Sequence, residues 1–156
     1  MNRVGIESKK AFSNGGVPMF LHHVGIGVRD LEKAIAFYRD ILGFTLEKRI
    51  DWDKSGLKAA LFSTGESKLE FIQAVNPAGR VALSLEKAAR EKDGIVHHLC
   101  FAVEDIDEAV RALVARKVRM IDEQPQTATG GRIAWLAEDA ADGFMIELCD
   151  LQYEIL

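Results

Sequence analysis

A repeat with a constant offset constrains the fold of this chain more than any other feature of its sequence. Residues 21–31 read LHHVGIGVRDL and residues 96–106 read VHHLCFAVEDI, so that His98 matches His23 at an offset of 98 − 23 = 75 residues. A doubled histidine, an alternating apolar stretch, an aspartate and the start of an amphipathic stretch recur in the same order. Self-similarity of this kind indicates a supersecondary unit whose copies pack together and share a buried core.

The rest of the chain divides around these two copies. Before the first copy, serine, lysine, asparagine and glycine occur without sustained periodicity and without the apolar stretch of a secretory signal, so we expect a flexible leader. Between the copies, Val81, Leu85 and Ala88 have the spacing of a helix that rests on the domain. The predicted division is a leader over 1–18, module one over 19–75, a linker helix within 76–93 and module two over 94–152, with a single domain spanning 19–152.

Each copy opens with a predicted strand that has two different faces. In module one, three apolar residues alternate with His23 and two glycines, and module two repeats this alternation around His98. The large apolar side chains share one face, which we expect to pack on a helix, while the second histidine of each pair lies on a face lined by small residues. Such a face is typical of a strand that lines a cavity. The first histidine of each pair, His22 or His97, is expected to point away from it.

A helix and three more strands follow in each module, so the predicted order is strand, helix, strand, strand, strand. Asp30 and Asp105 are expected to cap the helices. The apolar residues from Leu31 to Leu42, including Ile41, recur at helical spacing, and Gly43 ends the first helix. The further strands are expected over 44–52, 57–63 and 67–74 in module one and over 118–121, 132–137 and 143–150 in module two.

Two glutamates occupy matching places in the last strand of each module. Glu70 lies in KLEFI and Glu147 in FMIELC, at an offset of 147 − 70 = 77 residues. A single histidine or glutamate in an apolar strand is more often held by the backbone or exposed at an edge, but equivalent pairs in two repeats indicate a shared inward target. Imidazole and carboxylate ligands without a thiolate suit a divalent cation such as Co²⁺, Ni²⁺, Mn²⁺ or Zn²⁺. The predicted metal ligands are therefore His23, Glu70, His98 and Glu147.

Composition excludes some classes of function. The chain has 20 Lys and Arg against 24 Asp and Glu, a net charge of −4, which argues against sequence-independent binding of nucleic acid. No apolar run approaches the roughly 18–20 residues that cross a membrane. Cys100 and Cys149 are expected to be buried thiols in a reducing compartment, which favours a cytoplasmic protein.

The repeat and its ligand pattern resemble the vicinal oxygen chelate superfamily, which includes glyoxalase I, methylmalonyl-CoA epimerases and extradiol dioxygenases. The resemblance covers about 20–152 and implies an α+β fold, in which two βαβββ modules form a curved eight-stranded mixed sheet around a metal site. It places the metal on the same four residues. The chain is most similar to the epimerases, through HHVGIGVRDLEKAIAFYRDILGF, KLEFIQ, GIVHHLCFAVEDIDEAV, IDEQP, TGGRIAW and GFMIELCD.

This resemblance implies a metal-dependent isomerase that moves the proton on the carbon beside a thioester carbonyl, through an enolate. The metal stabilises the negative charge that develops on the carbonyl oxygen. Epimerisation also needs an acid and a base on opposite faces of the substrate. We expect Glu147 to be one proton carrier and Glu70 the other, because residues 56–61, GLKAAL, lack the glutamate that some epimerases carry there.

Several alternatives stay open at the level of sequence. A glyoxalase I acting on a glutathione adduct uses the same kind of ligand set, and a non-catalytic ligand-binding or resistance protein uses the same fold. An extradiol dioxygenase is disfavoured by the fourth ligand. The turn at Gly130, Gly131 and Arg132 is either a contact for a substrate carboxylate or phosphate, or a plain hairpin turn. The expected partners are a small-molecule thioester and a second copy of the chain in a homodimer, with no nucleic acid or membrane.

Overall fold

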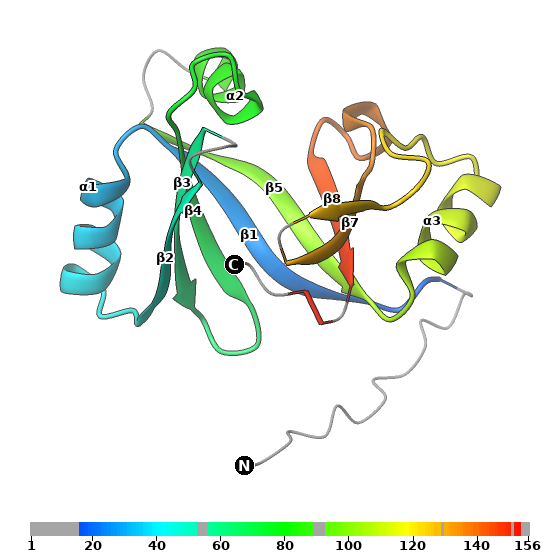
Figure 1. The fold of residues 1–156 in the computed structure, drawn as a ribbon, viewed down its shortest axis with the longest axis horizontal. Coiled ribbons are helices and arrows are strands. Elements are labelled where there is room, and N and C mark those ends of the chain that lie inside the picture. The colour runs from blue at the N-terminus through cyan, green and yellow to red at the C-terminus, as the bar shows by residue number, and fades with distance from the viewer. Residues whose placement is uncertain (1–15, 53–55, 89–92, 129, 151, 154–156) are drawn as a thin grey trace.

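One curved, eight-stranded mixed sheet forms the body of the protein, with α1 (Leu31–Ala36) and α3 (Ile106–Ala115) on its outer side and α2 (Arg80–Ala88) at one end (Figure 1). The computed structural model describes residues 16–52, 56–88, 93–128, 130–150 and 152–153. The strand order is β2-β3-β4-β1-β5-β8-β7-β6. The strands are β1 (Met19–Val28), β2 (Leu46–Trp52), β3 (Leu57–Ser63), β4 (Lys68–Ala74), β5 (Gly94–Val103), β6 (Gln126–Ala128), β7 (Gly131–Trp135) and β8 (Met145–Asp150).

Helices connect the strands in the predicted order. Most of the expected leader lies outside the described residues, and β1 begins at Met19. In the linker, Val81 and Leu85 are buried against Ile72 of β4, as their spacing predicts, while residues 89–92 lie outside the described part of the chain. The helical elements are α1 (Leu31–Ala36), a π-helical turn (Phe37–Ile41), α2 (Arg80–Ala88), α3 (Ile106–Ala115) and a short 3₁₀ turn (Glu138–Ala140).

The two copies of the repeat meet at the centre of the sheet. β1 and β5 pair antiparallel, β4 lies parallel to β1, and β8 lies parallel to β5. The same strand of each module therefore occupies an equivalent place on either side of the β1–β5 pair. This arrangement confirms the predicted α+β fold with a curved mixed sheet. Within the described part of the chain, no helix has the length and apolar character needed to cross a membrane.

The core lies between the outer face of the sheet and the helices. Phe62 and Phe71 meet edge to face at 5.7 Å between ring centroids and pack against α1 with Val28. In module two, Val103 and Leu148 are fully buried against α3. Both predicted caps are confirmed, since the Asp30 and Asp105 carboxylates accept backbone N–H groups at 3.0 and 2.9 Å. α1 and α3 thus cover the outer face of the sheet, and the site lies on the opposite face, where α2 packs on Ile72 at one end.

The end of the first helix is irregular, and one predicted strand of module two is wrong. Ile41 and Leu42 are 72% and 50% exposed, because the helix widens to a π turn in which the Leu42 N–H bonds to the carbonyl of Phe37, five residues back, and the apolar stripe rotates off the core. The strand expected over 118–121 is a single bridge between Met120 and Leu136.

The bridge is not extended because the chain turns away directly after it. The carboxylate of Asp122 accepts the N–H of Trp135 at 3.1 Å, which takes the place of a further backbone ladder bond. The edge strand of module two instead forms at β6, later in the chain.

Candidate metal centre

Four side chains from the four central strands converge on the inner face of the sheet. His23 lies on β1, Glu70 on β4, His98 on β5 and Glu147 on β8, and each is at most 5% exposed. The neighbours of Glu70 and Glu147 along their strands pack in the helix-covered cores, so the two carboxylates point to the opposite side. All four predicted ligand residues are therefore brought together by the pairing of β4, β1, β5 and β8.

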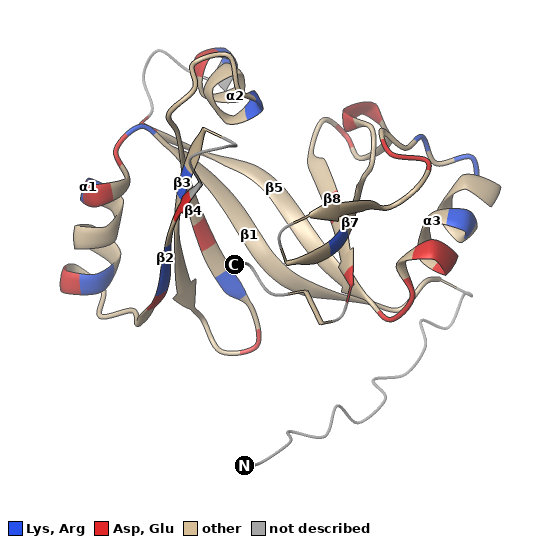
Figure 2. Cartoon of the chain, in the orientation of Figure 1, with Lys and Arg blue, Asp and Glu red and all other residues tan. Residues whose placement is uncertain are grey.

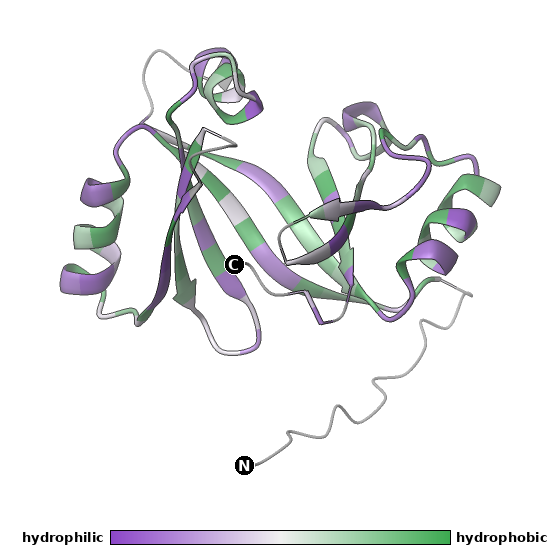
Figure 3. Cartoon of the chain, viewed as in Figure 1, coloured by the Kyte–Doolittle hydropathy of each residue, from purple (hydrophilic) through white to green (hydrophobic). Residues whose placement is uncertain are grey.

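Charged residues are otherwise kept away from the centre of the sheet. β1 and β5 contain no Asp, Glu, Lys or Arg, and Figure 2 shows both strands free of charge colours along their length. Hydrophilic bands interrupt the same strands in Figure 3, where each carries its histidine pair. The buried histidine and glutamate side chains at the centre of the sheet consequently have one another as polar partners.

The spacing of the imidazole and carboxylate atoms is close to the edges of a metal coordination polyhedron, and the ligand atoms of His23, Glu70 and His98 all lie within 4.8 Å of one another. The two Nε2 atoms of His23 and His98 are 2.9 Å apart. Each Nε2 lies 3.4–3.7 Å from Oε2 of Glu70 and of Glu147. Ligands about 2.1 Å from a cation in tetrahedral or octahedral geometry are separated by roughly 3.0–3.4 Å. The donor set and its spacing therefore fit a divalent first-row metal.

Burial sets the protonation of these groups. It raises the pKa of Glu70 to about 7 and, together with repulsion from Glu70, raises the pKa of Glu147 to about 8. Burial also lowers the pKa of His23 to about 2 and that of His98 to about 3, so both imidazoles are neutral and keep a lone pair for a ligand. Two carboxylates that burial pushes toward neutrality are the groups that a divalent cation would stabilise in their ionised form.

Gly25 makes room for one of the two imidazoles. It pairs with His98 across the β1–β5 ladder, and a Cβ at this position would overlap three atoms of the His98 ring. The ring also meets the indole of Trp135 edge to face at 5.2 Å between centroids. The His98 ring is therefore held between a strand that needs a glycine and an aromatic side chain from β7.

The expected direction of the first histidines is wrong. Leu21 pairs with Phe101 and His23 with Cys100, so His22 is an extra residue in β1, and His97 is likewise extra in β5, between residues paired with Gly25 and Ile26. A β-bulge of this kind turns the extra side chain toward the face of its neighbour. Both first histidines consequently lie beside the second ones, with Nδ1-to-Nδ1 distances of 2.8 Å in module one and 3.0 Å in module two.

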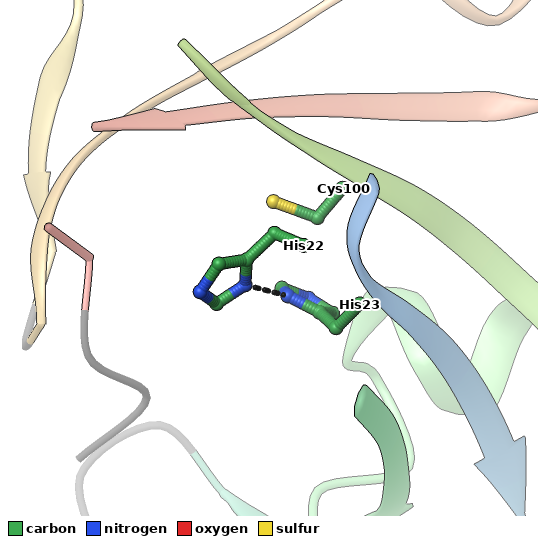
Figure 4. A group of neighbouring side chains, drawn as sticks. All are labelled: His22, His23 and Cys100. Atoms are coloured by element: carbon green, nitrogen blue, oxygen red, sulfur yellow. Dashed lines mark hydrogen bonds between the residues drawn. The ribbon is translucent and has the colours of Figure 1, made fainter. Parts of the chain in front are cut away.

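A second group of potential ligands lies beside the first. The ligand atoms of His22, His23 and Cys100 are within 4.8 Å of one another, and Figure 4 shows the hydrogen bond between the two imidazoles with the thiol nearby. Burial raises the pKa of the Cys100 thiol, and Cys149 and Glu147 are its hydrogen-bonding neighbours. A protonated thiol and two imidazoles make a poorer metal site than two imidazole Nε2 atoms and two carboxylates.

Tyr153 is a residue of the site that the sequence did not indicate. Its ring packs against Ile50, Ala59 and Leu61 of module one and also against Cys100 and Cys149 of module two. Burial and the nearby carboxylates of Glu147 and Glu70 raise its pKa. No repeat or periodicity marks this residue, since it follows the last strand.

The stretch where some epimerases carry a glutamate is apolar in the structure. Leu61 of β3 pairs with Glu70 of β4, and both Ala59 and Leu61 are buried beside Tyr153. No carboxylate is therefore contributed to the site by the described part of β3.

The glycine turn, at Gly130 and Gly131, lies at the start of β7. The Arg132 guanidinium is 2.6 Å from Asp107 of α3 and 3.3 Å from Asp150 of β8, so it ties α3 to the sheet. A Cβ at Gly131 would lie 3.2 Å from the Tyr153 ring, which this glycine accommodates. The structure thus gives Arg132 two partners within the chain.

Comparisons with known proteins agree with this architecture. A sequence model of the "Glyoxalase/Bleomycin resistance protein/Dioxygenase superfamily" matches residues 20–148. Human mitochondrial methylmalonyl-CoA epimerase is 32% identical over 129 residues, which are 82% of this chain and 72% of the human protein.

Solved structures show the same likeness. The structure of methylmalonyl-CoA epimerase from Mycobacterium tuberculosis superposes with a TM-score of 0.73 at 28% identity, covering 83% of this chain and 86% of that one. A Streptomyces coelicolor methylmalonyl-CoA epimerase variant in complex with 2-nitronate-propionyl-CoA superposes with a TM-score of 0.74 at 25% identity, covering 88% of this chain and 98% of that one. The chain therefore belongs to the glyoxalase/bleomycin resistance protein/dioxygenase superfamily.

Proposed function

We propose that this protein is a metal-dependent epimerase that moves the proton on the carbon beside the thioester carbonyl of methylmalonyl-CoA. One observation carries the proposal: Glu70 and Glu147 reach the two imidazoles from opposite sides, from strands that flank the β1–β5 pair. Inversion at a carbon needs proton carriers on two sides of the substrate. The epimerases among the relatives support the same reaction class.

His23, Glu70, His98 and Glu147 are the residues that would hold the metal, and Co²⁺, Ni²⁺, Mn²⁺ and Zn²⁺ all suit this donor set. When bound, the metal supplies a positive charge that stabilises the enolate form of the thioester. The neutral state of both imidazoles and the spacing of the four ligand atoms support this assignment.

In the proposed mechanism the two glutamates exchange protons with the substrate carbon. Glu147 takes the proton from one face, and Glu70 delivers a proton to the other face, with the roles reversed for the opposite enantiomer. Burial supports these roles, because in the metal-free protein it raises the pKa values of both carboxyls and so increases their affinity for a proton. Tyr153 packs beside the site, against residues of both modules.

The proposal also covers the contacts with the substrate and the oligomeric state of the protein. We propose that the turn at Gly130 and Gly131 contacts the substrate through its backbone, since the side chain of Arg132 is already paired with Asp107 and Asp150. The acyl-CoA analogue bound by the Streptomyces coelicolor relative supports a small thioester substrate. The homodimer and the cytoplasmic location stay predictions.

Two measurements on the purified protein test the function together. Metal analysis should find a divalent cation, and methylmalonyl-CoA in D₂O should exchange its α-proton in the presence of the protein. Glu147→Gln should abolish epimerisation, and exchange of the α-proton of the enantiomer that faces Glu147, while the metal stays bound, because the amide oxygen still ligates but cannot carry the proton. Glu86→Gln, on the exposed side of α2, is a matched control that should exchange like the wild type.

The outcomes separate the alternatives. Retained epimerisation in metal-loaded Glu147→Gln contradicts the role of Glu147. Bound metal without exchange in the wild type rejects the epimerase proposal and calls for an assay with methylglyoxal and glutathione, although the relatives described above give no support for a lyase. Absence of metal from a protein supplied with all four cations rejects the metal centre and favours a ligand-binding protein.

A further inference from the structure

The first histidine of each pair completes a hydrogen-bonded chain that ends at the proposed metal ligands. All four histidines of the protein take part, two in each module. In module one the chain continues outward, because Nε2 of His22 lies 3.1 Å from the backbone carbonyl oxygen of Tyr153. In module two it stops, because Nε2 of His97 is buried and has no hydrogen-bond partner among the described residues.

The carbonyl of Tyr153 determines the tautomers of module one. A carbonyl oxygen only accepts hydrogen bonds, so His22 must carry its proton on Nε2. Neutral His22 then has a lone pair on Nδ1, and this atom accepts a hydrogen bond from Nδ1 of His23 at 2.8 Å. His23 consequently carries its proton on Nδ1 and leaves Nε2 free. That free Nε2 is the atom that lies among the other ligand atoms.

We propose that His22 is a positioning residue for the metal centre, and that the Tyr153 carbonyl anchors it. His22 holds the His23 ring in the orientation and tautomer in which Nε2 ligates a metal. The proposal rests on the proposed metal-dependent function. Hydrogen bonds from a ligating imidazole to a neighbouring acceptor orient the ring and increase its basicity, and removal of such a partner costs about 10- to 100-fold in metal affinity.

Ordinary strand alternation explains the position of neither His22 nor Tyr153. His22 reaches His23 because it is the extra residue of a bulge. Tyr153 lies beyond residues 20–148, which match the superfamily, so the anchor comes from a part of the chain outside that match. The Tyr153 ring also meets the His22 ring edge to face at 5.8 Å between centroids, which holds the carbonyl and the imidazole in register.

Two variants of His22 test the role by separating hydrogen bonding from packing. His22→Leu fills a similar volume but offers no acceptor, whereas the side-chain oxygen of His22→Asn takes the place of Nδ1 and accepts from His23. Affinity for Zn²⁺ is measured on the full chain by competition with a chelator. We expect His22→Leu to bind about 10- to 100-fold more weakly than the wild type and His22→Asn to recover most of that loss. Equal affinity in His22→Leu and wild type, or equal weakness in both variants, overturns the proposal.

Nitrogen NMR of the histidine rings in metal-free wild-type protein gives a second, independent measurement. The expected signature is a proton on Nδ1 of His23 and on Nε2 of His22, and a His23 proton on Nε2 overturns the proposal. This readout does not depend on metal binding or on the folding of a variant. Absence of metal binding in the wild-type protein contradicts the proposed function. Weakened binding in His22→Leu alone is a different result and concerns only the role of His22.

Discussion

Replacement of Gly25 by alanine is the most direct perturbation of the metal centre, because it acts on a ligand without removing any ligand atom. A Cβ at this position overlaps three atoms of the His98 ring, and the most distant of the three, Nε2, would lie 2.6 Å away. Ordinary van der Waals contact begins at 3.4 Å, so the ring has to retreat by 3.4 − 2.0 = 1.4 Å at its nearest atom, Cε1, and by 3.4 − 2.6 = 0.8 Å at Nε2. The indole of Trp135 on β7 leaves it little room to do so.

The expected effect on metal binding follows from this displacement. A binding constellation has to be held within about 0.5 Å of its productive geometry, and metal–ligand distances vary by only about 0.2 Å. A shift of 0.8 Å in Nε2 therefore exceeds what the site tolerates. We expect Gly25→Ala to lose at least about 100-fold in affinity for Zn²⁺, since a loss of that size already follows from a 1 Å misplacement at a catalytic site.

Stability is expected to change less than metal affinity. Overpacking in a buried region costs about 1–3 kcal/mol, or roughly 2–12 °C in melting temperature for a chain of this size. Metal affinity is measured by chelator competition, and melting temperature by calorimetry of the metal-free protein. Gly27→Ala is the matched control on the same strand, because its Cβ would come no closer than 3.2 Å to any atom, the nearest being a Val81 methyl, and lies away from the imidazoles. Wild-type metal affinity in folded Gly25→Ala refutes the geometry described here.

Three further predictions concern charge, core and cap. In metal-free protein the free energy of unfolding should fall by about 2 kcal/mol from pH 7 to pH 9. Burial raises the pKa of Glu70 to about 7 and that of Glu147 to about 8, so the folded state releases protons over this range. The unfolded state has already lost these protons at pH 7, and the folded state is therefore destabilised as the pH rises. Saturating Zn²⁺ should remove this loss, and a rise in stability over the same range in urea titrations contradicts the argument. Phe71→Ala should cost about 3–5 kcal/mol in urea unfolding, since the ring is fully buried against Phe62, and a cost under 1 kcal/mol would contradict this packing. Asp105→Ala should cost about 1 kcal/mol through loss of its bond to the N–H of Glu108, while Asp105→Asn should restore most of it.

Much of the fold was predictable because the signals are local and occur twice. Alternation around His23 and His98 predicted the two central strands, and the aspartates before each helix predicted the caps, since each depends on a few consecutive residues. The convergence of Glu70 and Glu147 was predictable from the repeat, because equivalent residues of paired modules occupy equivalent places. The edge strand of module two was not predictable, because the carboxylate of Asp122 accepts the N–H of Trp135 across a loop and replaces a backbone hydrogen bond between strands.

The sequence by itself determined which four side chains face one another, since strand periodicity assigns a residue to a face and the repeat assigns the same face to its copy. Only the tertiary structure decided how His22 and His97 behave, because a bulge depends on the register between β1 and β5, which lie 75 residues apart. The same is true of Tyr153, whose contacts join both modules and the His22 ring. Register and chain return are set by packing over the whole sheet, and no short stretch of sequence encodes them.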